Sequence, residues 1–453
     1  MRAPVLSFTD RGIYCPAGDF FVDPWRPVPR ALITHGHADH ARPGMGAYLA
    51  TDAAAPVLRH RLGRDIALDT IAYGETRRLG GASVSFHPAG HVPGSAQIRI
   101  EVAGEVWVVS GDYKTAPDGL SEPFEPVPCH TFISECTFGL PVFRWQDQAR
   151  IADQLAAWWQ AAREAGQTPV LGAYSLGKAQ RLLSLLDPGQ GPILTHGAVE
   201  ATTAILRDQG YDLPETVPVT PDTRPADHPG ALVLCPPAAM GTSWSRRFGP
   251  ISAGFASGWM QLRGIRRRRA ADRGFVISDH ADWDGLNAAI TATGAETIYV
   301  THGYTEIFSR WLVDQGHDAR ILPTEFGQDE DGDAPAPVDP AAGVQGDTSA
   351  PVPGDTNVPV PGDIDAHVPG DNDPPVPQDS DAPAAGDTNT PIPGDTNARM
   401  PDTTNAPAPG DTDTPVPGDT DTPIRDDTNG PAPGDTNTSD ASPHGAAKPP
   451  AVS

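Results

Sequence analysis

The stretch Thr34-His35-Gly36-His37-Ala38-Asp39-His40 places four residues of metal-binding type within six consecutive positions. The apolar run Ala-Leu-Ile at residues 31–33 comes directly before it and predicts a β-strand. The four side chains would therefore lie in the loop at the carboxyl end of that strand. Imidazole nitrogens and carboxylate oxygens are ligands for metals such as zinc and manganese. A single histidine is usually a packing or surface residue, but this density of ligands predicts a metal site.

Two later segments carry a His and an Asp that could complete the same site. His91 lies in Ala-Gly-His-Val-Pro-Gly-Ser-Ala at 89–96, and Asp112 ends Ser-Gly-Asp at 110–112. Either residue alone would more often belong to a capped turn, but their order after the first stretch favours a ligand role. In this order the sequence resembles the metallo-β-lactamase fold, an α/β fold in which two sheets are packed between helices as an αββα sandwich.

The resemblance implies a site for two divalent metal ions, zinc or manganese. The implied ligands are His35, His37 and His91 for one ion, Asp39, His40 and His302 for the other, and Asp112 as a bridge between them. Asp39 is thereby also expected among the catalytic residues. Asp23 is expected to orient a ligand by hydrogen bonding.

Four more segments narrow the resemblance to the β-CASP nucleases, a branch of this fold that acts on nucleic acids. They are Ser-Glu-Cys-Thr-Phe-Gly at 134–139, Tyr-Ser-Leu-Gly-Lys-Ala-Gln at 174–180, Ser-Asp-His-Ala-Asp at 278–282 and Thr-His-Gly at 301–303. The resemblance implies that His280 contacts the scissile phosphate or protonates the leaving 3′ oxygen, a role that suits an imidazole. Glu135 is expected to orient His280 or a metal ligand; the alternative is an exposed carboxylate at a strand end.

Two groups of residues are candidates for binding nucleic-acid phosphates. Ser175 is expected to cap a helix whose first turn, with Lys178, would hold a phosphate, although a simple cap explains it equally well. Lys178 stands where the β-CASP motif has arginine. The arginine run that includes Arg266, Arg267 and Arg268 would bind backbone phosphates, the alternative being a solvated helix face.

The periodicity of apolar residues predicts a strand-rich beginning followed by mixed α and β structure. Strands are expected near residues 31–34, 83–87, 97–102, 106–110, 297–301 and 320–323, and helices near 148–162, 177–186, 199–209 and 283–293. Because candidate ligands come both before residue 115 and after residue 279, the middle is expected to be an inserted domain. The predicted domains are a metallo-β-lactamase domain at 1–139 and 276–327, an inserted β-CASP domain at 140–275, and a tail at 328–453.

The tail differs sharply from the rest of the chain. It holds 24 acidic and three basic side chains and repeats Gly-Asp-Thr and Pro-Val-Pro, so most of the net charge of −26 belongs to it. Such a composition cannot bury enough apolar surface to offset ordering entropy, and we expect disorder. The four cysteines lack zinc-ribbon or CxxC spacing, and neither a signal peptide nor an apolar run of membrane-spanning length is evident. A cytoplasmic protein with no membrane partner is expected.

Residues 137–145, Thr-Phe-Gly-Leu-Pro-Val-Phe-Arg-Trp, are most similar to bacterial ligase-associated DNA exonucleases. That resemblance implies a metal-dependent DNA exonuclease of DNA repair, with an ATP-dependent DNA ligase and a helicase as partners and DNA as substrate. The same chemistry also fits an RNA 3′-end processing nuclease. A weakly active nucleic-acid-binding scaffold would not need the complete ligand set, and a small-molecule hydrolase would not need the inserted domain or His280.

Overall fold

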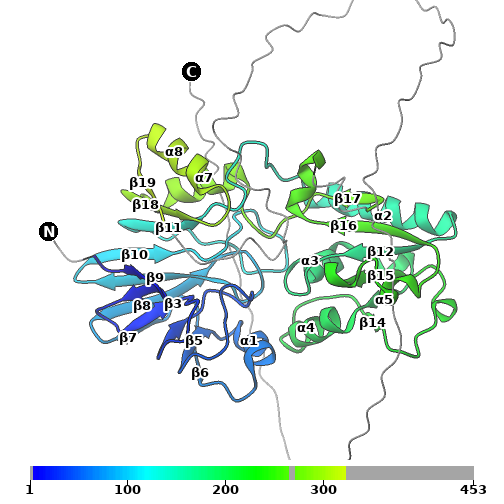
Figure 1. Ribbon diagram of the computed structural model, residues 1–453, viewed down its shortest axis with the longest axis horizontal. Helices are drawn as coiled ribbons and strands as arrows, with labels where there is room; N and C mark the ends of the chain where they lie inside the picture. Colours follow the sequence, from blue (N-terminus) through cyan, green and yellow to red (C-terminus); the bar gives the residue numbers. More distant parts are fainter. Residues whose placement is uncertain (1–3, 265–270, 323–453) are drawn as a thin grey trace, which may run out of the picture. The chain divides into compact units, whose positions relative to one another are not determined.

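The computed structural model describes residues 4–264 and 271–322. The tail expected at 328–453 and the arginines Arg266, Arg267 and Arg268 lie outside the described residues. The described chain contains sheets and helices of the mixed α/β class, as the sequence predicted (Figure 1).

The elements fall into three sheets with helices between and around them. The strands are β1 (Ser7–Thr9), β2 (Gly12–Cys15), β3 (Phe20–Val22), β4 (Ala31–Leu32), β5 (Tyr48–Thr51), β6 (Leu68–Ile71), β7 (Thr76–Leu79), β8 (Ala82–Pro88), β9 (Ala96–Val102), β10 (Glu105–Val109), β11 (Thr131–Glu135), β12 (Thr168–Gly172), β13 (Ile193–Thr195), β14 (Val217–Pro218), β15 (Leu232–Cys235), β16 (Ile251–Ala256), β17 (Arg273–Phe275), β18 (Thr297–Thr301) and β19 (Asp318–Ile321). The α-helices are α1 (Ala55–Leu62), α2 (Gln148–Glu164), α3 (Lys178–Leu185), α4 (Gly197–Asp208), α5 (Ser243–Arg246), α7 (Trp283–Thr293) and α8 (Thr305–Asp314).

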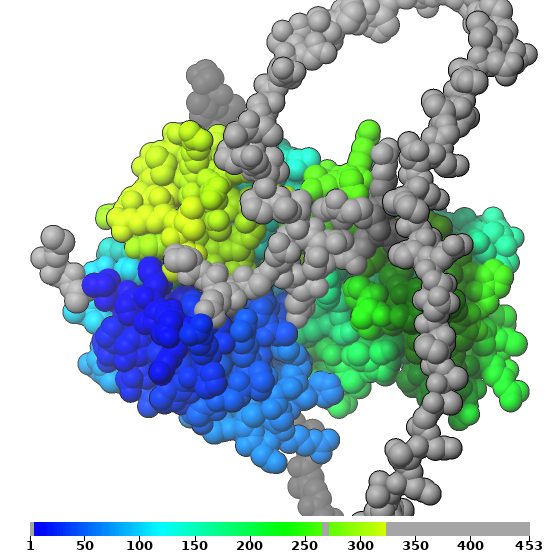
Figure 2. Space-filling view, in the orientation of Figure 1, coloured from blue at the N-terminus to red at the C-terminus, as the bar shows by residue number. Residues whose placement is uncertain are grey.

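Two of the sheets share one apolar core. The first sheet has the order β1-β2-β3-β4-β5-β6 and the second β19-β18-β11-β10-β9-β8-β7. Side chains such as Phe20 and Leu32 from the first sheet pack with Phe86 and Ile98 from the second. The first strand, β1, also meets β18 from late in the chain. The ring centroids of Phe8 and Tyr299 are 5.0 Å apart, and the blue and yellow-green surfaces adjoin in Figure 2.

Helices cover the outer faces of these two sheets. Ala55 and Leu58 of α1 pack on the outer face of the first sheet, and α7 and α8 pack on that of the second through residues such as Ile290 and Phe308. The resulting order is helix, sheet, sheet, helix.

The third sheet is entirely parallel, with the order β14-β13-β15-β12-β16-β17. Its strands lie in the chain between β11 and β18, which are parallel neighbours in the second sheet. Helices α2, α3 and α4 cover one face through a core that includes Trp159, Leu182 and Leu206. The domain boundaries at 139/140 and 275/276 stay predictions.

The elements agree best with the sequence where apolar periodicity is strong. Helix α7 and strand β18 have the predicted limits, whereas β4 is shorter than expected and β19 begins two residues earlier. The predicted cap of α3 was wrong: the residue before the helix is Gly177, not Ser175. Gly177 adopts φ +83°, and its N–H donates to Oε1 of Gln180 at 2.9 Å, so the side chain three residues on satisfies the helix start instead.

Candidate metal centre

The candidate ligands come from loops at the carboxyl ends of strands. Asp23 follows β3, and His35 to His40 follow β4; these two strands are parallel neighbours. Asp112, Glu135 and His302 lie at the ends of β10, β11 and β18, which are also parallel neighbours. Since both sets of strands end at the same edge of the sandwich, residues far apart in sequence meet there.

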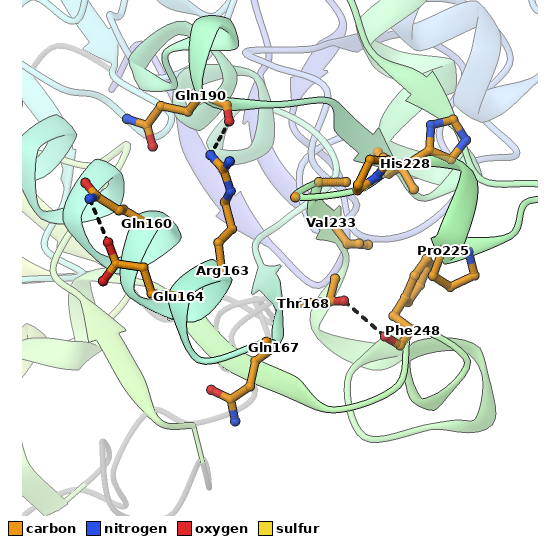
Figure 3. Close-up of a pocket in the computed structure, with 15 residues that line it drawn as sticks. Gln160, Arg163, Glu164, Gln167, Thr168, Gln190, Pro225, His228, Val233 and Phe248 are labelled. Carbon is orange, nitrogen blue, oxygen red and sulfur yellow. Dashed lines mark hydrogen bonds between the residues drawn. The ribbon is translucent and has the colours of Figure 1, made fainter.

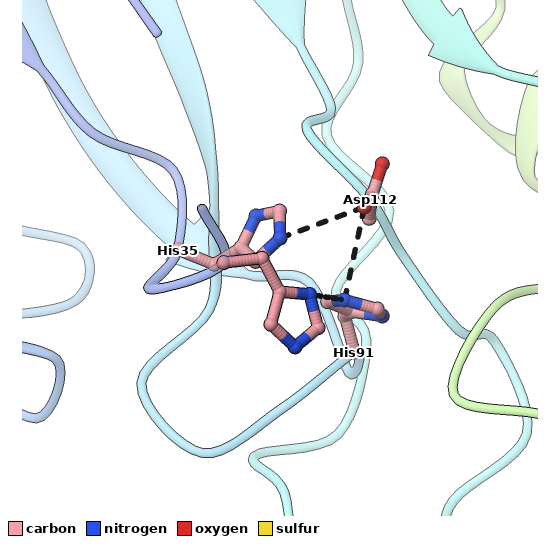
Figure 4. Close-up of side chains that lie close together, drawn as sticks. His35, His91 and Asp112 are labelled. Atoms are coloured by element: carbon pink, nitrogen blue, oxygen red, sulfur yellow. Dashed lines mark hydrogen bonds and ion pairs between the residues drawn. The ribbon is translucent and has the colours of Figure 1, made fainter. Parts of the chain in front are cut away.

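The predicted ligands form two groups that share Asp112. One group is His35, His37, His91 and Asp112, the other Asp39, His40, Asp112 and His302, and in each group the ligand atoms lie within 4.8 Å of one another. Figure 4 shows His35 and His91 directed at Asp112, with Nε2 atoms 3.5 and 3.8 Å from its Oδ2. All seven predicted ligands are therefore brought together in two adjoining clusters.

Hydrogen bonds to main-chain oxygens orient two of the histidines. Nε2 of His37 lies 3.2 Å from the oxygen of Leu176, and Nδ1 of His91 lies 2.8 Å from the oxygen of Asp279. A carbonyl only accepts, so these nitrogens carry protons, and in the neutral form of each ring, the form that binds metal, the opposite nitrogen offers a lone pair. Those two nitrogens, Nδ1 of His37 and Nε2 of His91, are 3.1 Å apart. Two lone pairs facing each other repel unless a cation lies beside both, and the spacing fits ligands of one zinc ion with bonds of about 2.0–2.1 Å.

The titration behaviour of the cluster also fits a cation. Burial lowers the pKa of His35, His91 and His302, which keeps these imidazoles neutral, the form that binds metal. Burial would also lower the pKa of His40, but the carboxylates of Asp112 and Asp39 raise it well above its usual range. The carboxylates of Asp112 and Asp39 therefore favour a positive charge beside them in this buried site. Within residues 4–264 and 271–322, the buried atoms Nε2 of His35 and Oδ1 of Asp112 have no hydrogen-bond partner.

Asp23 has the position expected of an orienting residue. Its Oδ2 lies 2.8 Å from Nδ1 of His40, and its carboxylate also accepts from the N–H and hydroxyl of Thr34 at 2.8 and 2.5 Å. This arrangement turns Nε2 of His40 toward Asp112, 3.4 Å from Oδ2. Asp23 adopts φ +41°, so its backbone is held in an uncommon conformation to make these contacts.

His280 and Glu135 lie together beside the metal groups. Nδ1 of His280 is 2.9 and 3.0 Å from the two carboxylate oxygens of Glu135, which is buried. The ring of His280 lies 4.6 Å from that of His91, measured between centroids. The exposed-carboxylate alternative for Glu135 was therefore wrong, because the end of β11 is enclosed by its neighbours β10 and β18. Glu135 also accepts from the N–H of Tyr113 at 2.9 Å.

Two side chains that the sequence did not single out for the site hold the segment carrying His280. Arg181, on α3, is buried and donates to the oxygen of Ser278, with Asp279 Oδ1 at 3.4 Å. Trp145 donates from Nε1 to the oxygen of His280 at 2.8 Å. No sequence signal marked Arg181, because its partners, the oxygen of Ser278 and the carboxylate of Asp279, lie 97 and 98 positions further along the chain. Trp145 drew attention only through its resemblance to one sub-family.

The predicted phosphate contacts Ser175 and Lys178 belong to neither ligand group, although Ser175 lines the same cavity as His37. Ser175 is half-buried, and Nζ of the buried Lys178 lies 4.6 Å from the ring centroid of Tyr174. The described structure thus places Lys178 against an aromatic ring.

The chain is similar to proteins that act on nucleic acids. It is 29% identical over 311 residues to a probable DNA ligase of Opitutus terrae, a match that covers 68% of this chain and 30% of the ligase. It is 31% identical over 123 residues to the endoribonuclease YSH1 of Kluyveromyces lactis and 27% over 122 residues to cleavage and polyadenylation specificity factor 73 of Drosophila melanogaster. These matches support the β-CASP resemblance.

Each match covers only part of the proteins compared. The two RNA-processing matches cover 26% of this chain, and the chain spans less than a third of the length of every one of these three relatives. No protein-family profile matches the chain. Among the described helices, none is both long and apolar enough to cross a membrane.

Proposed function

We propose that this chain is a binuclear phosphodiesterase, specifically a DNA exonuclease of DNA repair that works with an ATP-dependent DNA ligase. The helix, sheet, sheet, helix order supports a metallo-β-lactamase sandwich, and the parallel sheet between β11 and β18 supports an inserted β-CASP domain. The observation that carries the proposal is the pair of His and Asp groups sharing Asp112, with His280 and Glu135 beside them.

The two groups would each hold one divalent ion, zinc or manganese, in the roles assigned above. Two such ions neutralise the phosphate charge and generate a nucleophile from water at neutral pH. The chain's own residues supply the orientation. The main-chain oxygens of Leu176 and Asp279 fix the ring nitrogens of His37 and His91, and Asp23 fixes those of His40.

His280 would act as the general acid toward the leaving 3′ oxygen. Its Nδ1 faces the carboxylate of Glu135, so Nδ1 holds a proton and Nε2 is the atom available to the substrate. The buried carboxylate of Glu135 accepts from Nδ1, so the proton that His280 would give to the leaving oxygen is one on Nε2. Arg181 holds the main chain at Ser278 and Trp145 holds it at His280 itself, and together they would position the ring.

The ligase relative favours DNA over RNA. Its match covers 68% of this chain, against 26% for the two RNA-processing relatives, so more of the chain is similar to the probable DNA ligase than to either of them. A similarity to part of a probable DNA ligase fits a nuclease that prepares ends for ligation. The endoribonuclease relatives keep an RNA-processing nuclease as the second candidate.

The test is a direct assay of the purified full chain with manganese or zinc on matched, end-labelled DNA and RNA single strands of one sequence. We expect mononucleotides to be released from one end of the DNA, with slower or no cleavage of RNA. Asp112→Ala is the control for a contaminating nuclease. Faster cleavage of RNA would establish the second candidate, and no cleavage of either polymer with any divalent metal would reject both.

A further inference from the structure

A cavity of about 630 Å³ opens beside the proposed metal centre. His37 forms part of its wall together with Arg61 of α1, and Tyr174, Ser175, Pro236 and Pro237 form the facing wall. The volume lies within the range of about 300–1,000 Å³ that small-ligand sites occupy. The cavity adjoins His37, whereas the proposed acid His280 packs against a different histidine, His91.

The position of the cavity in the third sheet is the one where open parallel sheets bind ligands. Tyr174 follows β12, and Pro236 follows β15, two strands that pair directly in parallel. The cavity therefore lies outside the carboxyl ends of adjacent strands. A larger cavity of about 900 Å³, shown in Figure 3, lies at the opposite ends, where Thr168 begins β12 and Ala231 precedes β15.

The charge of the cavity selects an anion. The described residues that line it include Arg61 and His60 but no carboxylate, although acidic residues outnumber basic ones in the chain. The Arg61 guanidinium donates to the oxygen of Gly36, the residue between His35 and His37, so its charge lies at the rim of the metal centre. The cavity of Figure 3 differs, because Glu164 lines it and its Arg163 donates to the oxygen of Gln190.

The facing wall has the shape and chemistry to hold a base. Tyr174 offers an aromatic ring already placed beside the cation of Lys178, with Nζ 4.6 Å from the ring centroid. Pro236 and Pro237 are rigid apolar surfaces, and Ser175 adds a polar side chain to the same lining. Stacking on such surfaces holds nucleotides without reading their sequence.

We propose that this cavity binds the nucleotide that keeps the scissile phosphate, with its 5′-phosphate at Arg61 and its base against Tyr174 and the two prolines. The inference rests on the proposed function only for its place in the reaction. Since His280 would protonate the leaving 3′ oxygen, the nucleotide on the other side of the cut retains a 5′-phosphate. A nucleoside 5′-monophosphate is therefore the minimal ligand.

The test measures binding of thymidine 5′-monophosphate to the manganese-loaded full chain by calorimetry, so that it does not depend on hydrolysis. Ala238→Trp fills the cavity from an exposed position and should weaken binding about tenfold or more, the size expected for losing one stacked base. Arg61→Ala should weaken it by a similar factor through loss of a charge-assisted hydrogen bond, about tenfold. Thymidine, which lacks the phosphate, should bind much more weakly to the wild type.

Two matched variants and a metal analysis complete the design. Gln167→Trp places the same bulk in the cavity of Figure 3, and Arg64→Ala removes an exposed arginine just beyond α1; both should bind the nucleotide as the wild type does. All four variants should retain the wild-type metal content. If Ala238→Trp and Arg61→Ala bind the nucleotide normally, the cavity is not the site and the inference is wrong. If these two variants bind the nucleotide more weakly but the wild type cleaves no nucleic acid, the cavity is the nucleotide site and the nuclease proposal is wrong.

Discussion

The Nε2 atom of His37 lies 3.2 Å from the main-chain oxygen of Leu176, a residue 139 positions further along the chain. Leu176 directly precedes the Gly177 cap of α3, so a helix packed on the third sheet sets the orientation of a proposed metal ligand on the first. The same helix carries Arg181, which holds the segment that orients His91 and carries His280. The third sheet and its helices therefore help to build the candidate metal centre itself.

Gly177→Ala should weaken metal binding. Gly177 has φ +83°, and a Cβ there would clash with Cγ1 of Val92, next to His91, so the Leu176 oxygen must shift away from His37. Loss of such an orienting contact typically costs about 10- to 100-fold in metal affinity, which a chelator-competition titration would measure. Gly210→Ala is the control, since Gly210 has φ +92° but no atom within 4 Å of a Cβ. Equal metal affinity in the two variants would contradict the orienting role.

Asp112→Ala should reduce both metal content and activity, because Asp112 belongs to both ligand groups. Elemental analysis is expected to find two ions per wild-type chain and fewer in the variant, with nuclease activity lower by several orders of magnitude. Asp69→Ala removes an exposed carboxylate on β6 and should change neither. Fully active wild-type protein with one ion or none would rule out the binuclear proposal.

His280→Ala should keep both ions and nearly normal DNA binding while kcat falls by about 10² to 10⁴, the usual effect of losing a general acid. A nitrophenyl phosphodiester has a leaving group that needs little protonation, so the variant should lose less activity on it. Glu135→Gln should lower kcat less than His280→Ala and shift the pH profile, because the imidazolium loses its carboxylate partner. An equal loss of activity on both substrates would show that His280 does not act as an acid.

The folded protein should lose stability in alkaline solution. Burial raises the pKa of Cys235 and Cys129 to about 12, against an ordinary value of 9.0, and burial also raises the pKa of Tyr113. Above pH 9.0 the unfolded chain loses these protons while the folded chain keeps them, so stability is complete below that pH and falls as pH rises toward 12. Urea unfolding at a series of pH values measures this slope. Cys235→Ala should make the slope shallower; an unchanged slope would show that Cys235 does not contribute.

The sequence by itself predicted those features that depend on residues close together in the chain. The four possible ligands between His35 and His40 are recognisable because one loop carries them, and α7 and β18 have the expected limits because their apolar periodicity is strong. The remaining proposed ligands, His91, Asp112 and His302, were named through resemblance to a family, since nothing local distinguishes them from residues of ordinary turns.

Only the tertiary structure decided how the centre is oriented and what lies beside it. The contacts of His37 with Leu176 and of His91 with Asp279 use main-chain oxygens. Every residue has such an oxygen, so these contacts could not be predicted from residue types. The capping residue of α3 was mispredicted because Ser175 has a capping side chain, whereas Gly177, with its positive φ, stands at the cap position. The cavity beside His37 joins Arg61 to Pro236, and such a wall exists only once α1 and the third sheet have packed.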